Sequence, residues 1–170
     1  MVNETFISIL KLDSECVGYS IQELEKMELL YDVNFAGSLK LFMQLAGRSA
    51  GKTLGDDFSM LYSSSMSVRD HIFYQEGRRV VLSDHVGLHE WTLEKPFFFS
   101  ESSFSYMFFV KTRPKDANDT NKVFCLDENE DSVSEEPWDF DGFILDRIKK
   151  RKKKPPKNNL TCQGEMLIVK

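Results

Sequence analysis

Apolar residues recur at helical spacing in several segments of the N-terminal half of the chain. Residues 6–12 form a short periodic stretch that predicts a first helix. A firmer helix begins after Ser20, because Glu23 stands three residues on as a capping-box partner. Its expected apolar face consists of Ile21, Leu24, Met27 and Leu30.

A third helix is predicted from residue 38 to 46, with Ser38 as its cap. We expect Gly47 to end this helix in the left-handed conformation, and Arg48 to complement the exposed carbonyl groups. Residues 68–76 also fit a helical pattern.

Extended patterns dominate the middle of the chain, where short runs of β-branched and aromatic residues are separated by Gly and Pro. Two further strands are expected to pair as a hairpin with a loose tip formed by the polar residues 112–121. The fold class that follows is a single α+β domain with an antiparallel sheet and helices packed mainly on one face. The expected strands cover residues 78–82, 91–93, 97–100, 106–111 and 122–126.

Charge is segregated at the C-terminal end of the chain. Residues 127–141 contain eight acids and no bases, and residues 147–157 contain eight bases and no acids. The basic run is interpreted as a helix end that breaks at Pro155 and becomes a linker, followed by an apolar segment at 164–170 that could add an edge strand. The expected organisation is a domain over residues 1–148 and a tail over residues 149–170.

Composition places the chain among soluble globular proteins. It has 170 residues, 41% hydrophobic residues and a net charge of −5, and no apolar run approaches the roughly 18 residues needed to cross a bilayer. The first residues contain an acid and no basic leader, so we expect a cytoplasmic protein with no membrane partner.

The spacing of the Cys and His residues gives little support for a metal site or a disulfide. Cys16, Cys125 and Cys162 lie far apart without CxxC spacing, which favours reduced structural thiols. His85 and His89 are four residues apart, as metal ligands on a helix would be, but Gly87 lies between them. A turn with two surface histidines is the preferred interpretation, and no metal is expected.

Residues 46–53 satisfy two catalytic patterns at once. Gly47, Ser49 and Gly51 match the GxSxG of a hydrolase, and Gly51, Lys52 and Thr53 end a loose phosphate-binding loop. Both chemistries need a strand to enter the glycines and a helix to leave them. Here the pattern predicts a helix entering, so we expect a glycine-rich connector, no catalytic residues and no cofactor.

Several segments of the chain, in their order along the sequence, resemble the SUKH superfamily, the Smi/Knr-like proteins. The resemblance includes the helix and glycine segment at residues 40–58, and it departs from the family at Val33, Asn34 and Phe35, where a Pro usually stands. The other matching segments are residues 20–28, 96–100, 104–110, 123–129 and 138–148.

This resemblance implies a non-catalytic immunity protein that binds and neutralises a cognate toxin. Many such toxins act on nucleic acid through basic clefts, which an acidic surface can match. Trp138, Phe140 and Phe124 are candidate anchors, although Trp138 and Phe140 also fit the core of a closing helix together with Phe143 and Ile144. The candidate partner-binding residues are Asp127, Glu128, Glu130, Asp131, Glu135, Glu136, Asp139 and Asp141.

Three other functions remain open. A regulatory scaffold of the same fold would also bind a protein partner. A nucleotide binder would use the loop at residues 46–53. The basic run has no interleaved aromatic residues, so it could bind nucleic acid or anionic lipid through counterion release alone, although a helix end that becomes a linker is the preferred interpretation.

Overall fold

The computed structural model describes residues 4–54, 59–60, 68–103 and 105–153. Its helices are α1 (Glu4–Leu12), α2 (Ile21–Tyr31), α3 (Gly37–Ala46), α4 (Gly51–Leu54), α5 (Val68–Val80), α6 (His89–Leu93) and α7 (Phe140–Lys153), with a π-helical turn at Val81–His85 and a 3-10 turn at Ala117–Asp119. Its strands are β1 (Cys16–Val17), β2 (Ser49–Ala50), β3 (Ser59–Met60), β4 (Pro96–Ser102), β5 (Tyr106–Lys111), β6 (Lys122–Asp127) and β7 (Ser132–Asp139).

The main sheet is an antiparallel meander in the order β3-β4-β5-β6-β7, and β1 and β2 form a small separate pair. The predicted pairing of β5 with β6 is confirmed, with Phe109 opposite Phe124. The α+β class and the antiparallel sheet are confirmed as well. Strands β4 to β7 follow one another as hairpins, which lets sequential strands pair as antiparallel neighbours. The connection between β3 and β4 is longer and contains α5 and α6.

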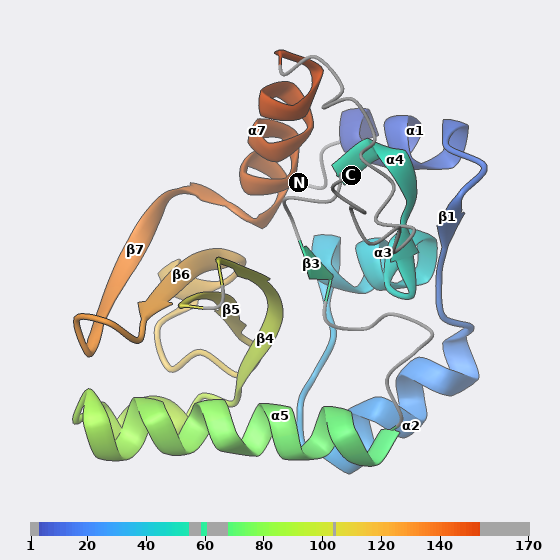
Figure 1. Ribbon diagram of the computed structural model, residues 1–170. Coiled ribbons are helices and arrows are strands. Elements are labelled where there is room, and N and C mark those ends of the chain that lie inside the picture. The colour runs from blue at the N-terminus through green and yellow to red at the C-terminus, as the bar shows by residue number, and fades with distance from the viewer. Residues whose placement is uncertain (1–3, 55–58, 61–67, 104, 154–170) are drawn as a thin grey trace, which may run out of the picture.

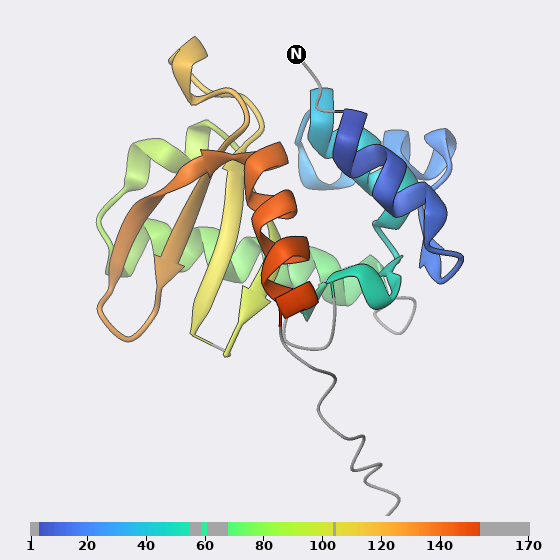
Figure 2. The same ribbon diagram turned by 90° about the horizontal axis from the view of Figure 1, so that it is seen from above.

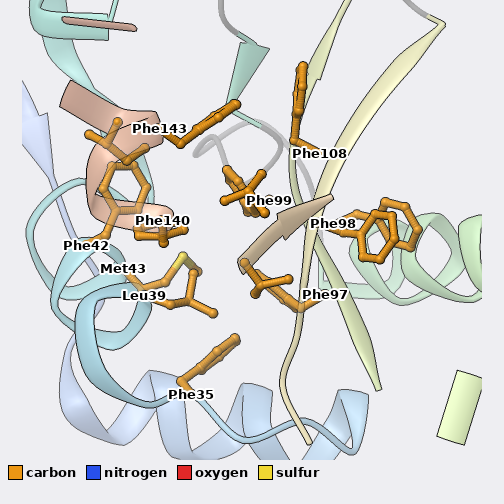
Figure 3. Close-up of a cluster of buried hydrophobic side chains, with 14 of the residues drawn as sticks. Phe35, Leu39, Phe42, Met43, Phe97, Phe98, Phe99, Phe108, Phe140 and Phe143 are labelled. Carbon is orange, nitrogen blue, oxygen red and sulfur yellow. The ribbon is translucent and has the colours of Figure 1, made fainter. Parts of the chain in front are cut away.

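One face of the sheet packs against α7 and α3 (Figures 1 and 2). The ring of Phe99 on β4 lies 5.0 Å from that of Phe140, and Phe108 on β5 lies 4.9 Å from Phe143. The ring of Phe42 on α3 lies 5.5 Å from the ring of Phe140. These aromatic rings form the centre of the core, which Figure 3 shows between the strands and the two helices.

The opposite face is covered by α5 and α6. Phe98 points to the other side of β4 from its neighbours (Figure 3), and its ring meets Phe109 at 4.9 Å. Trp91 of α6 lies 5.0 Å from Phe124 and 6.2 Å from Phe109. The helices thus lie mainly on the α7 side, as predicted, while this second covering layer is an addition that the sequence pattern did not indicate.

The strands predicted at residues 78–82 and 91–93 are wrong, because both segments are helical. The buried guanidinium of Arg79 explains the first error: its Nε donates to the carbonyl of Pro96, and its Nη atoms donate to the carbonyl of Tyr31 at the end of α2. These contacts hold the segment against α2 and β4. Tertiary packing has overridden the β propensity of Val80 and Val81.

The buried face of α2 differs from the prediction. The capping box of Ser20 and Glu23 is confirmed, but the buried face of α2 is Leu24, Met27 and Tyr31. Ile21 and Leu30, expected on that face, are half exposed.

Helix α3 begins one residue earlier than predicted, with Ala36 as its cap residue and no side-chain cap. Ser38 is buried inside the helix instead of capping it.

The loop between β5 and β6 is held by a buried cation, which corrects the expectation of a loose tip. Lys111 Nζ lies 3.2 Å from Glu94 Oε1 and 2.8 Å from Asp119 Oδ2. The same ammonium group sits 3.7 Å from the centroid of the Trp91 ring. A buried charge that is paired and packed over an aromatic ring fixes both ends of the loop.

The C-terminal part of the described chain holds two features that the sequence pattern did not indicate. The acidic stretch contains strand β7, and α7 continues past residue 148, where the tail was expected to begin, to Lys153. The break at Pro155, the linker, the apolar segment at 164–170 and Cys162 lie outside the described residues.

Candidate functional site

The first part of the segment at residues 46–53 closes a helix, as the sequence indicated, but the segment is more than a connector: the short strand β2 (Ser49–Ala50) runs into Gly51, where the four-residue helix α4 begins. Strand β2 belongs to the small antiparallel pair with β1 and not to the main sheet. Helix α3 runs into it and ends at Gly47, whose backbone N–H donates to the carbonyl of Met43. The predicted left-handed conformation is wrong, since Gly47 has φ −63°. A Cβ atom there would lie 2.6 Å from Met43 O and 2.7 Å from Tyr19 Cδ2, so close packing explains the glycine.

A carboxylate of the same chain occupies the loop where a phosphate would be expected. Asp13, in the turn after α1, accepts hydrogen bonds at Oδ2 from the backbone N–H of Thr53, at 2.9 Å, and from the Thr53 hydroxyl. A Cβ atom on Gly51, which has φ +56°, would lie 2.7 Å from the same oxygen. The anion-binding capacity of this loop is therefore used inside the fold.

These hydrogen bonds also set the charge state of Asp13. The Thr53 hydroxyl above all, with backbone N–H groups of Glu15, Thr53 and Lys52, lowers the pKa of Asp13 from its ordinary value of 3.8, against the effect of burial. The carboxylate is thus ionised at neutral pH and bridges the end of α1 to α4.

The two basic residues of the segment also contact the N-terminal part of the chain. Arg48 pairs with Glu23, and its guanidinium lies 4.4 Å from the centroid of the Tyr19 ring. Arg48 was expected to complement the carbonyl groups at the end of α3, but it contacts α2 instead. Lys52 pairs with Glu15 and remains 80% exposed.

The histidines of the described residues do not form a metal cluster. His89 Nδ1 lies 2.6 Å from Ser83 Oγ and is exposed. Across the described part of the chain, no group of three or more His, Cys, Asp or Glu side chains is placed to hold a metal ion.

The described cysteines, Cys16 and Cys125, are free thiols. Burial, as the largest effect, raises the pKa of each thiol to about 11, with nearby carboxylates acting in the same direction. Both are therefore protonated at neutral pH, when thiols are poor nucleophiles.

The candidate acidic residues lie along the β6–β7 hairpin and the start of α7, at the left of Figure 1. Glu130 and Asp131 are exposed in the turn, and Glu135 and Asp139 are exposed on β7. Asp127, Glu128 and Glu136 are half-buried. We call the side chains of Glu130, Asp131, Glu135, Glu136 and Asp139 the acidic surface.

Several of these acids also support the fold. Glu128 pairs with Arg78 of α5, and Glu135 pairs with Lys122 at 3.1 Å. Asp139 Oδ1 accepts a hydrogen bond from the backbone N–H of Gly142, so it caps α7. These residues are thus partly committed to intramolecular contacts.

Asp141 does not belong to a surface, and its inclusion is corrected. Its residue is 5% exposed, in the first turn of α7 beside the fully buried Phe140. The first turn faces the core because α7 packs on the sheet there.

The aromatic candidates separate clearly by exposure. Phe124, Phe140 and Phe143 are buried in the core, whereas Trp138 is 38% exposed at the end of β7. Trp138 is therefore the aromatic candidate that a partner could reach.

Strand β7 forms one edge of the main sheet. Glu135, Glu136 and Pro137 lie in it, and charges and Pro are common on edge strands because they oppose pairing with another sheet. The acids thus have a structural explanation besides partner binding. Sequence reasoning missed β7 because its residues lack an alternating apolar pattern.

A comparison with protein families found no family model that matches the chain, and comparisons with curated proteins and with solved structures found no match. The resemblance to the SUKH superfamily therefore depends on the sequence segments alone. None of the described helices is long and apolar enough to span a membrane.

Proposed function

We propose that this chain is a non-catalytic binding protein that engages a basic protein partner through the acidic surface, and that the partner is a cognate toxin. The observation that carries the proposal is the combination on one edge of the sheet of exposed carboxylates with the half-exposed Trp138. Charges of one sign steer an oppositely charged partner, and a Trp side chain supplies apolar contact area.

The contacts of the glycine-rich segment support the non-catalytic part of the proposal. Asp13 fills the loop, Arg48 is paired with Glu23, and Lys52 with Glu15. A nucleotide would have to displace the Asp13 carboxylate and overcome the repulsion of Glu15.

The SUKH resemblance supports the toxin as the partner class. A protein that neutralises a toxin of its own cell would act in the cytoplasm, and that location is part of the proposal. The second candidate is a regulatory scaffold of the same fold, which would use the same surface without neutralising a toxin.

Co-expression in a bacterial host tests the proposal. The probe is any toxin domain found encoded beside the gene of this chain, and we expect the wild-type chain to restore the colony growth that this domain stops. The variant Glu130→Lys/Glu135→Lys/Glu136→Lys is expected to lose most of this protection.

The matched control reverses three exposed acids elsewhere, as Glu25→Lys/Asp84→Lys/Glu90→Lys, and should protect like wild type. Failure of the wild-type chain to protect would contradict the immunity function. Equal protection by both variants would contradict the assignment of the acidic surface.

A further inference from the structure

Strand β7 and helix α7 form two arms that meet at residues 139–140 and leave that corner in different directions (Figures 1 and 2). The arms are similar in length. The eight residues of β7, whose pairing with β6 shifts register near the corner, span at most about 26 Å at roughly 3.3 Å each. The 14 residues of α7 span about 21 Å at about 1.5 Å each.

The two arms carry opposite charge. The β7 arm presents Glu130 in its preceding turn and Glu135 along the strand, and both are exposed. The α7 arm presents the exposed Lys149 and Lys150, of which Lys150 also pairs with Asp146 at 2.7 Å. Both lysines lie on the far half of α7, whereas Glu130 lies at the opposite end of β7 from the corner.

Trp138 lies at the corner between the arms. A Cβ atom on Gly142 would lie 3.0 Å from Trp138 Cβ, so the indole can pack closely on α7 only because residue 142 is a glycine. Lys150 Nζ lies 5.4 Å from the centroid of the Trp138 ring. The side chain remains 38% exposed, with acids on one side and bases on the other.

We propose that this corner is a homodimer interface, in which β7 of each copy lies beside α7 of a second copy. A two-fold axis along the bisector of the angle between the arms maps the direction of one arm onto the other. Each acidic arm then faces a basic arm, and the two Trp138 side chains meet near the axis. Such an interface is isologous, so the same surface serves both copies.

The charge pattern favours a second copy as the occupant. A partner that covers both arms needs bases opposite β7 and acids opposite α7, and this chain has that distribution in arms of similar length. A central Trp with charged residues around it is also the usual arrangement of a protein interface. The inference goes beyond the proposed function and stands without it, although both use the acids of β7.

Sedimentation equilibrium of the full chain tests the inference. At low salt, the weight-average mass is expected to rise with concentration towards twice the 19.7 kDa of one chain. Raising NaCl from ~50 mM to ~500 mM shortens the screening length severalfold and should return the mass to that of one chain. A single-chain mass at every concentration and salt level would overturn the proposal.

Two charge-reversal variants make the test specific. Glu130→Lys/Glu135→Lys reverses the charge at two positions of the β7 arm, and Lys149→Glu/Lys150→Glu reverses it at two positions of the α7 arm. Each variant alone should associate at least ~10-fold more weakly than wild type, whereas a mixture of the two should form a heterodimer. Unchanged association of either variant alone, or a mixture that stays monomeric, would contradict the charge pairing.

A further substitution tests the contribution of Trp138. Trp138→Ala should weaken association by at least ~10-fold. Phe73→Ala, which removes an aromatic ring that is 63% exposed on α5, should leave association unchanged. Equal effects of the two substitutions would place the interface elsewhere. The Lys149→Glu/Lys150→Glu variant keeps the acids of β7, so it should still bind toxin while it no longer dimerises. This result separates the inference from the proposed function.

Discussion

The side-chain amide of Gln75 satisfies both backbone hydrogen-bonding groups of Phe98. Its Nε2 donates to the Phe98 carbonyl at 2.7 Å, and its Oε1 accepts from the Phe98 N–H at 3.0 Å. Gln75 is fully buried on α5. The amide therefore binds the backbone groups of β4 as a neighbouring strand would, next to the described pairs of β3 with Ser100 and Glu101.

Gln75→Met should destabilise the fold by about 2–4 kcal/mol, because it leaves two buried backbone groups without partners. Urea unfolding followed by circular dichroism measures the loss. The control Gln22→Met, at an exposed site on α2, should change the free energy of unfolding by less than about 0.5 kcal/mol. Similar unfolding midpoints for both variants would contradict this role of Gln75.

Gly47 and Gly77 should respond in opposite directions to alanine. A Cβ atom on Gly47 meets Met43 O at 2.6 Å, whereas a Cβ atom on Gly77 in α5 meets nothing within 4 Å. Gly47→Ala is expected to cost about 1–3 kcal/mol through overpacking, and Gly77→Ala to add about 0.5–1 kcal/mol through helix propensity. Thermal unfolding of the two variants decides this, and a stable Gly47→Ala protein would show that Tyr19 and α3 can separate at no cost.

The sequence was informative about the regular elements and less so about what packs on them. Hydrophobic spacing and the Ser20 capping box located α2 correctly, and aromatic runs located β4, β5 and β6. The chain from Arg78 to Leu82 was misread because a local pattern cannot show that Arg79 donates to Tyr31, 48 residues away. Long-range hydrogen bonds of this kind override local propensity.

The Asp13 contact predicts a pH dependence of stability. Since its pKa is lower in the folded chain than its ordinary value of 3.8, Asp13 contributes stability that is present above that value and is lost as pH falls through the folded pKa. Chemical unfolding should therefore show wild type more stable than Asp13→Asn at pH 7. This difference should shrink as pH falls below about 4. A constant difference would mean that the carboxylate charge is not what binds Thr53.

Ser49→Ala and Lys52→Ala test the absence of chemistry in the glycine-rich segment. Each should leave toxin binding unchanged, because Ser49 accepts a bond from Gly51 N and Lys52 pairs at the surface with Glu15. ATP with Mg²⁺ should also give no thermal shift, although a ligand at 100 times its Kd would stabilise the fold by about 2.7 kcal/mol. A clear shift that Lys52→Ala removes would establish the nucleotide-binding alternative.

The candidate site was only partly predictable. The sequence located the acids but could not show that Asp141 is buried or that Asp139 caps α7. The Asp13 contact with Thr53 was missed because the two residues are 40 positions apart and the turn after α1 carries no distinctive motif. Exposure, which separates Trp138 from Phe140, depends on the packing of α7 and not on residue type.

Calorimetric titration of the purified chain with the toxin domain whose growth arrest it relieves measures binding through the acidic surface. We expect wild type and Ser49→Ala/Lys52→Ala to bind with the same Kd. Glu130→Lys/Glu135→Lys/Glu136→Lys should raise Kd at least ~10-fold, with the difference reduced at high salt. An unchanged Kd for the acid-reversed chain, with loss of binding on substitution in the glycine-rich segment, would contradict binding through the acidic surface.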